Sequence, residues 1–193
     1  MQLDSPFIRD QFVREFESRL ALFARYHEDT FPLEEIAHLA TPQSARKILR
    51  AVLKIVSRLH QFNIVHNDIC LSTLFVAGVF EPDSGLDNIF LSGFSEATGD
   101  MTRAKDDCFQ VFRTIQDFLG QRFVLPKFWT GDAQLDRLWQ HLVEHGNDSW
   151  PCTVQEICHL SDINLSQDTQ EPQTISISKG FSFRHTSKRR VIP

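Results

Sequence analysis

His66, Asn67 and Asp68 form the short motif in this chain with the clearest chemical potential, because a carboxylate beside an imidazole is a typical pair for acid–base chemistry. Asp68 could accept a proton from a hydroxyl group, with His66 next to it. No nucleophile or metal-binding group accompanies the pair in the sequence, however. The alternative is that both side chains hydrogen-bond the backbone of their own loop and take no part in chemistry.

A second pattern, HLVEH at residues 141–145, matches the H-x-x-E-H arrangement of some zinc proteases. Two histidines four residues apart on one helix face could bind zinc, with the glutamate as base. No third ligand is evident, and leucine and tryptophan side chains of the same helix are needed for packing. Cys152 and Cys158 are better explained as small buried residues. We therefore predict no metal site.

The elements that must position these residues are predicted by hydrophobic periodicity. Ser5-Pro6 and Thr41-Pro42 are typical helix starts. The predicted helices cover residues 5–23, 42–60, 106–119, 132–145 and 153–159. Short β-type runs lie at residues 63–65, 74–76 and 89–91, and a turn-rich loop between the last two indicates a hairpin. The expected fold is mainly α-helical with a small β-hairpin.

Composition favours a soluble intracellular protein. The chain has 193 residues, 41% of them hydrophobic and 23% charged. It lacks an apolar stretch of the roughly 20 residues that would span a bilayer, and it begins without the pattern of a secretory signal. Its four cysteines form no CxxC motif, which is typical of reduced thiols in the cytoplasm or the nucleus.

Charge separates the C-terminal end from the rest. Residues 1–178 hold 15 basic and 25 acidic residues, whereas residues 179–193 hold five basic residues and no acid. The acidic part disfavours nucleic-acid binding. Residues 161–193 are expected to form a flexible basic tail. Its Lys188-Arg189-Arg190 could be a nuclear-import or acidic-partner signal, and alternating Ile and Phe at 175–183 could add a strand to a partner's sheet; a solvated, unbound end is the alternative.

Four landmarks together resemble the protein-kinase fold, specifically its C-terminal lobe. In chain order they are residues 59–69 (a helix end and HND loop) with a strand following at 74–76, residues 89–97 (strand, Gly-Phe and a small residue), 107–112 (a helix start) and 150–157 (WPCTVQEI). They occupy the places of the H-R-D loop, the D-F-G strand, the central helix and the R-P-T turn of that family. The resemblance implies that Asp107 braces the backbone of the 66–68 loop.

Departures from the kinase pattern indicate that phosphoryl transfer is absent. Kinases hold magnesium with the D-F-G aspartate and a catalytic-loop asparagine, but Gly93 (before Phe94) and Thr73 stand at these positions. Cys70 replaces the catalytic-loop lysine, and Asn67 replaces the arginine of H-R-D. We therefore expect no ATP, magnesium or other cofactor.

Two further kinase features are missing. Only 14 residues separate Gly93 from Asp107, which is too short for an activation segment ending in A-P-E. The arginine that pairs with that glutamate is replaced by Trp150. Since losing one partner would leave an unpaired buried charge, their joint absence supports the resemblance.

The expected domains are a helical segment at 1–40, a kinase C-lobe-like domain at 41–160 and the tail at 161–193. Nothing before residue 40 resembles G-x-G-x-x-G or V-A-I-K, so the N-lobe is expected to be missing. Its absence would expose apolar surface. The sequence has 17 Phe, and we expect Phe7, Phe12, Phe16 and Phe23 to cover that surface.

Three functions are compatible with these observations. The leading one is a truncated, catalytically inactive pseudokinase that acts as a protein-interaction or regulatory module, with a protein partner or an oligomer. The second is an enzyme of another class that uses the His66/Asp68 cleft on a small molecule. The third is half of a split assembly whose partner supplies a nucleotide-binding lobe.

Overall fold

The computed structural model describes residues 11–16, 19–24, 30–77 and 89–160, and for the first two ranges it describes the backbone alone. The strands are β1 (Gln11–Phe16), β2 (Arg19–Ala24), β3 (Thr30–Pro32), β4 (Leu74–Ala77) and β5 (Ile89–Leu91). The helices are α1 (Leu33–Ile36), α2 (Pro42–Gln61), α3 (Ala104–Leu119), α4 (Ala133–His145) and α5 (Val154–Leu160). The prediction of a mainly helical chain with a small β element is confirmed.

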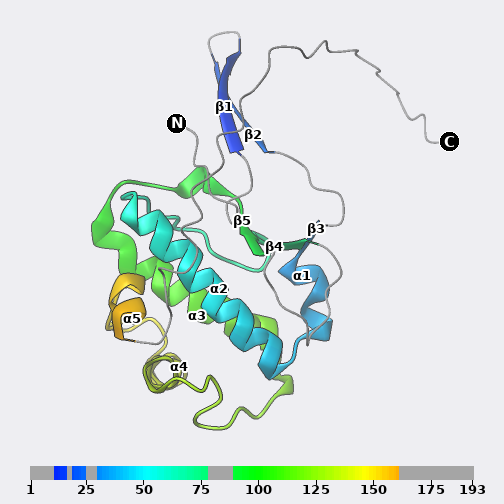
Figure 1. Ribbon diagram of the computed structural model, residues 1–193, viewed down its shortest axis with the longest axis vertical. Coiled ribbons are helices and arrows are strands. Elements are labelled where there is room, and N and C mark those ends of the chain that lie inside the picture. Colours follow the sequence, from blue (N-terminus) through cyan, green and yellow to red (C-terminus); the bar gives the residue numbers. More distant parts are fainter. Residues whose placement is uncertain (1–10, 17–18, 25–29, 78–88, 161–193) are drawn as a thin grey trace, which may run out of the picture.

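The long helix α2 is the centre of the fold. The hydroxyl of Thr41 accepts a hydrogen bond from the backbone N–H of Ser44 at 3.1 Å, and Ser44 Oγ accepts one from the backbone N–H of Thr41 at 2.9 Å. This reciprocal cap satisfies two N–H groups at the helix start. Apolar side chains along one broad face of the helix are buried. Helix α2 therefore packs against both α3 and α5 (Figure 1).

The three-stranded antiparallel sheet has the order β3–β4–β5. The register pairs Leu74 with Leu91 and Phe75 with Phe90, so the predicted hairpin is confirmed. Leu74 and Leu91 are buried, while Phe75 and Phe90 on the other face are half-buried. Because side chains alternate along a strand, the sheet lays one apolar face on the helices and fixes where the residues after each strand lie.

The helix predicted for residues 5–23 is wrong over residues 11–16 and 19–24, which form the antiparallel pair β1 and β2. The register pairs Phe12 with Phe23 and Phe16 with Arg19. The four-residue spacing of Phe12 and Phe16 fits a helix face, but it also fits a strand, because four is a multiple of the strand period of two. The side chains of Phe7, Phe12, Phe16 and Phe23 lie outside the described residues.

The buried core includes residues before position 41, in the segment that the sequence predicts to be an N-terminal addition to the domain. Strand β3 pairs with β4, and Leu33 and Ile36 of α1 belong to the same buried cluster as α2 and α3. The sequence did not predict β3 and α1 as separate elements, because both are too short to carry a periodic signal. The tail predicted at 161–193 lies outside the described residues. No described helix has the length and apolar character needed to cross a membrane.

Candidate functional site

The loop that carries His66 and Asp68 is braced by a buried carboxylate from α3. Asp107 accepts hydrogen bonds from the backbone N–H of His66 at 2.8 Å and of Asn67 at 2.7 Å. Its Oδ2 also lies 2.9 Å from Nε2 of His60, and both side chains are completely buried. Asp107 therefore ties the end of α2, the loop and the start of α3 to one another.

Two further residues of α3 hold the same loop. The side-chain amide of Gln110 accepts from the N–H of Ile69 at 2.8 Å and donates to the carbonyl of Asn67 at 3.0 Å. The Thr114 hydroxyl donates to the carbonyl of Ile69 at 2.9 Å. Asp107, Gln110 and Thr114 are three and four residues apart, so they lie on one helix face. Gln110 and Thr114 were not among the predicted site residues, because their spacing from Asp107 places them on the same helix face but does not show that this face meets the loop.

The imidazole of His66 uses both ring nitrogens inside the fold. Its Nε2 lies 2.9 Å from the carbonyl oxygen of Ser92, and its Nδ1 accepts from the N–H of Asp68 at 3.3 Å. These partners require the neutral tautomer with the proton on Nε2. Burial lowers the pKa of His66 below its usual 6.5, and nearby Asp107, Ser92 and Asp68 oppose this only partly. His66 is therefore neutral, and the lone pair on its Nδ1 already accepts a hydrogen bond from Asp68.

We expect the stability of the protein to fall in acid partly because of His66. A group whose folded-state pKa is lowered contributes fully above its unfolded pKa, about 6.5 for histidine. The contribution is lost as the pH falls from there through the lower folded-state value. Urea unfolding of wild type and His66→Gln at about pH 7.5 and about pH 5.5 should therefore show a smaller loss in the variant. Equal losses would contradict the assignment.

Asp68, Cys70 and Thr73 form a compact hydrogen-bonded turn. The Thr73 hydroxyl accepts from the N–H of Cys70 at 2.9 Å and lies 2.9 Å from the carbonyl of Asp68. The Cys70 thiol lies 3.8 Å from Oδ1 of Asp68 and 3.2 Å from the Ser72 hydroxyl. Thr73 therefore stabilises the turn through its hydroxyl. Its Cγ2 methyl group faces Gly93.

Gly93 packs directly against that methyl group. Its φ is +81°, a conformation that glycine adopts readily and other residues rarely. A Cβ atom added at Gly93 would lie 2.8 Å from Cγ2 of Thr73. Because such a contact is much shorter than van der Waals distance, no side chain fits at Gly93 unless Thr73 moves. The two positions that resemble the metal-binding positions of kinases thus close against each other.

Residues 94–103 run back across the loop. The ring of Phe94 packs edge-on against His66, with centroids 4.7 Å apart. Asn67, with φ of 65°, donates from its amide to the carbonyl of Glu96 at 2.9 Å. Val65 and Thr98 exchange backbone hydrogen bonds at 2.8 and 2.9 Å. Residues 94–98 of this segment are therefore fastened to the loop.

Trp150 fills the position at which the kinase resemblance implies an arginine. Its indole packs on Phe109 and Phe112 of α3 and on His141 of α4, with centroid distances of 5.4–5.5 Å. The neighbouring thiol of Cys108 is buried, which raises its pKa well above the ordinary value. Burial also raises the pKa of Cys158 to about 11. This region is a core of buried aromatic and thiol side chains, in which a hydrogen bond with Cys108 lowers the pKa of Cys152.

The H-x-x-E-H pattern places its two histidines side by side on α4. His141 and His145 stack on each other with centroids 4.8 Å apart, and His141 Nε2 lies 3.2 Å from the carbonyl of Asp148. Within the described part of the chain, no group of three His, Cys, Asp or Glu side chains is arranged to hold a metal ion.

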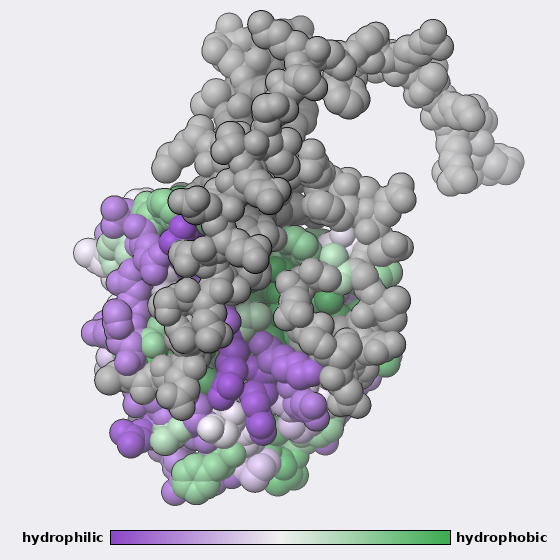
Figure 2. All heavy atoms as spheres, in the orientation of Figure 1, coloured by the Kyte–Doolittle hydropathy of each residue, from purple (hydrophilic) through white to green (hydrophobic). Residues whose placement is uncertain are grey.

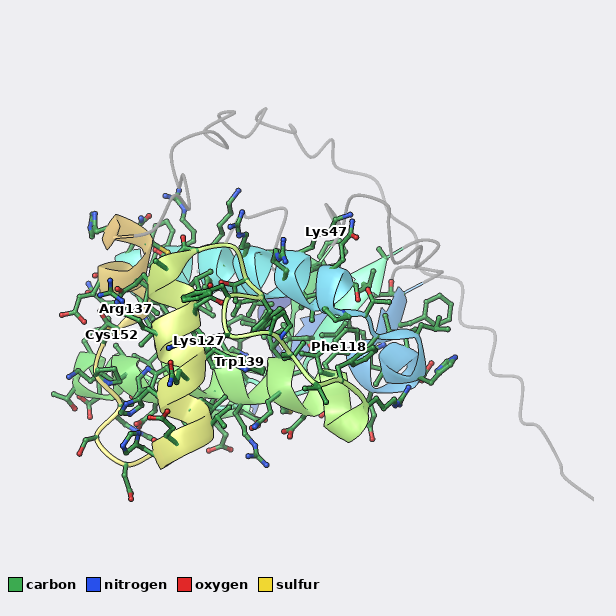
Figure 3. All side chains as sticks on the ribbon, turned by 90° about the horizontal axis from the view of Figure 1, so that it is seen from below. Lys47, Phe118, Lys127, Arg137, Trp139 and Cys152 are labelled. Atoms are coloured by element: carbon green, nitrogen blue, oxygen red, sulfur yellow. The ribbon has the colours of Figure 1, made fainter. Side chains whose placement is uncertain are left out.

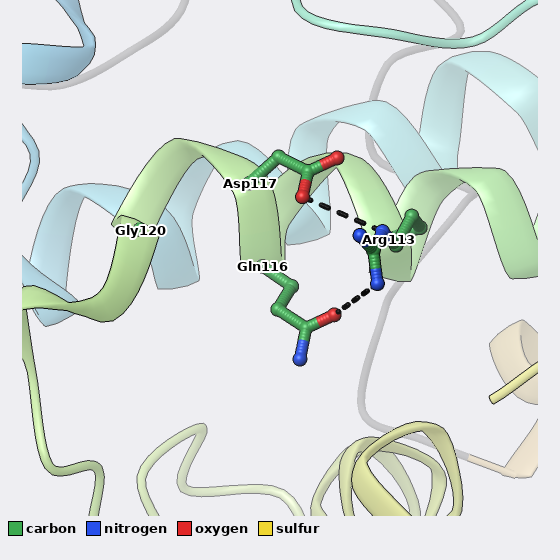
Figure 4. Close-up of a pocket in the computed structure, with 4 residues that line it drawn as sticks. All are labelled: Arg113, Gln116, Asp117 and Gly120. Carbon is green, nitrogen blue, oxygen red and sulfur yellow. Dashed lines mark hydrogen bonds and ion pairs between the residues drawn. The ribbon is translucent and has the colours of Figure 1, made fainter. Parts of the chain in front are cut away.

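A hollow on α3 is also separate from the loop. It is lined by Arg113, Gln116, Asp117 and Gly120 (Figure 4). The Arg113 guanidinium lies 3.4 Å from the Asp117 carboxylate and donates to Gln116 at 3.1 Å. Its polar groups are paired with one another, and none of the loop residues lines it. The hollow therefore gives Asp68 no substrate-binding cavity.

Comparison with known proteins assigns no family to this chain. A scan of protein-family models finds no match, and the search of curated proteins finds no matching sequence. The loop held by Asp107, the neutral His66 and the closed contact between Thr73 and Gly93 are therefore the observations on which a functional proposal must rest.

Proposed function

We propose that this chain is a catalytically inactive, kinase-like protein that acts as a protein-interaction or regulatory module. The observation that carries the proposal is the contact between Thr73 and Gly93. Kinases place two metal-binding side chains at the corresponding positions to neutralise charge on the transferred phosphoryl group. Here one position has no side chain, and the other faces it with a methyl group.

The preserved brace around the loop supports the same proposal. Asp107 makes three buried contacts, and Gln110 makes two more to the same loop. These contacts maintain the shape of the loop without supplying a reactive group. A scaffold that keeps its architecture and lacks metal ligands is suited to recognition by its surface.

The alternative, an enzyme that uses the His66/Asp68 cleft on a small molecule, has weaker support. A general base must have a free lone pair within reach of its substrate. The Nδ1 lone pair of His66 accepts from Asp68 N–H, and Nε2 faces the Ser92 carbonyl. His66 would have to break one of these contacts before it could exchange a proton with a ligand.

Thermal unfolding in the presence of ATP tests the proposal. We expect no shift of the unfolding temperature with ATP alone and none with ATP and magnesium. A ligand at a hundredfold excess over its Kd would stabilise the native state by about 2.7 kcal/mol, which corresponds to a shift of several degrees for a chain of this size.

A magnesium-dependent shift would contradict the proposal directly, because it requires metal ligands that the loop does not present. A shift with ATP alone would also contradict it, since the nucleotide would then be bound without the metal. AMP at the same concentration is the control for effects of ionic strength and adenine.

A further inference from the structure

Helix α2 carries an unusual concentration of positive charge. Its five cationic residues, with no carboxylate among them, are Arg46, Lys47, Arg50, Lys54 and Arg58. The arginines are spaced so that they lie along one side of the helix. Figure 3 shows Lys47 on the outer side of α2, pointing away from the helices beneath it. This basic side contrasts with the acidic excess of residues 1–178.

Arg50 lacks a carboxylate partner among the residues that the structure describes. Its Nε is buried and makes no hydrogen bond there. A guanidinium group has five N–H donors arranged for a carboxylate or a phosphate. Arg50 is thus a cation whose binding capacity is not used within the described fold.

A second feature borders this basic side. Residues 123–128, which connect α3 to α4, expose Val124 fully (102%) and Phe128 by 69%. Phe123 and Leu125 alternate with Val124 and pack on the core instead. Lys127 lies over the Phe128 ring, with its Nζ 5.8 Å from the centroid. Figure 2 shows hydrophobic residues along the lower edge of the molecule, where Figure 1 places this connection.

Arg46 joins the two features. Its guanidinium donates to the backbone carbonyl of Trp129, the residue after Phe128. A Cβ atom at Gly131 would lie 3.7 Å from Nη1 of the same arginine. The end of the exposed segment is therefore fastened to α2, one helical turn before Arg50. In Figure 2 a hydrophilic zone lies directly above the hydrophobic lower edge.

We propose that this basic–apolar surface (Arg46, Arg50, Val124, Lys127 and Phe128) binds an acidic protein segment that also carries apolar side chains. Carboxylates complement the cations of α2 and Lys127, and apolar side chains cover Val124 and Phe128. A nucleic acid fits less well, because its phosphates would meet an acidic body and would leave both apolar side chains exposed. The inference rests on the proposed role as an interaction module and specifies its partner.

Selection from a displayed library of random peptides of about 12 residues on the full chain tests this surface. We expect enriched peptides to combine Asp or Glu with Leu, Ile, Phe or Trp. The most enriched peptide, synthesised with a fluorophore, should bind Arg50→Gln and Val124→Ser at least about tenfold more weakly than wild type. A tenfold change in Kd equals about 1.4 kcal/mol. Its affinity should fall as salt concentration rises.

Two matched substitutions on α4 serve as controls. Arg137 is exposed and Val143 is 61% exposed, so Arg137→Gln and Val143→Ser remove the same groups elsewhere and should leave binding unchanged. Circular dichroism must show that each variant is folded. The assigned surface is wrong if the control substitutions weaken peptide binding as much as Arg50→Gln and Val124→Ser do. It is also wrong if basic or purely polar peptides are enriched. Tighter binding of a DNA or RNA duplex than of the peptide, lost in the same variants, would overturn the choice of a protein partner.

The peptide selection and the ATP titration test the assigned surface and the proposed function separately. If acidic and apolar peptides are enriched but bind all variants equally, the interaction role is supported and the assigned surface is wrong. If ATP with magnesium stabilises the chain, the proposed function fails whatever the selection gives.

Discussion

Replacing Asp107 with alanine should lower the free energy of unfolding by about 3–5 kcal/mol, because it leaves several buried polar groups without a partner. The backbone N–H groups of His66 and Asn67 lie 2.8 and 2.7 Å from the carboxylate. The third partner is Nε2 of His60 at 2.9 Å. The His60 and His66 groups are buried and that of Asn67 is partly buried, so water could replace the lost bonds only in part. The loss in free energy of unfolding therefore includes the cost of unpaired N–H donors as well as that of the lost hydrogen bonds.

Chemical denaturation of Asp107→Ala and Asp106→Ala measures this effect with a matched control. Asp106 is the neighbouring carboxylate on the same turn of α3, with its side chain 48% exposed and 3.4 Å from Arg103. Its loss should cost at most about 1 kcal/mol, since exposed pairs contribute little. Asp107→Asn keeps the shape and one acceptor oxygen, so we expect an intermediate value.

Hydrogen exchange adds a local measurement. In Asp107→Ala the amides of residues 66 and 67 should exchange faster than in wild type, relative to amides in the middle of α2. Similar stabilities for the alanine variants at 106 and 107 would show that the loop does not depend on the carboxylate. The same result would remove the main support for treating the loop as a preserved scaffold.

The helices were predictable because their signals are local. Thr41-Pro42 marks the start of α2, and Asp132 marks that of α4, where its carboxylate accepts from the N–H groups of Gln134 and Leu135. Apolar periodicity then specifies each buried face over several turns. The N-terminal segment was mistaken for a helix because the four-residue spacing of Phe12 and Phe16 fits both periods. No local feature of the sequence indicates that Phe12 pairs with Phe23.

The site was only partly predictable. A short motif revealed His66 and Asp68, and the kinase resemblance pointed to Asp107. Gln110 remained hidden, because a polar side chain that faces a loop looks the same in a sequence as one that faces water. Thr73 and Gly93 are 20 residues apart in the chain, and only the pairing of β4 with β5 brings them together.

Substituting Gly93 with alanine should destabilise the protein by about 2–4 kcal/mol, from two separable causes. The left-handed backbone, with φ of +81°, costs an alanine about 1 kcal/mol more than a glycine. The new Cβ would also lie 2.8 Å from Cγ2 of Thr73, and relieving such overpacking typically costs about 1–3 kcal/mol.

A double-mutant cycle with Thr73→Ser separates these causes. Serine keeps the hydroxyl that bonds to Cys70 and Asp68 and lacks the Cγ2 methyl, while the Thr73 Cβ is 3.5 Å from the added atom and needs no movement. In the Thr73→Ser background, Gly93→Ala should therefore cost only the backbone part, which gives a coupling energy of about 1 kcal/mol or more. Equal costs in both backgrounds would mean that position 93 requires glycine for its backbone alone. The steric closure of the two metal-equivalent positions, on which the proposed inactivity rests, would then have no energetic support.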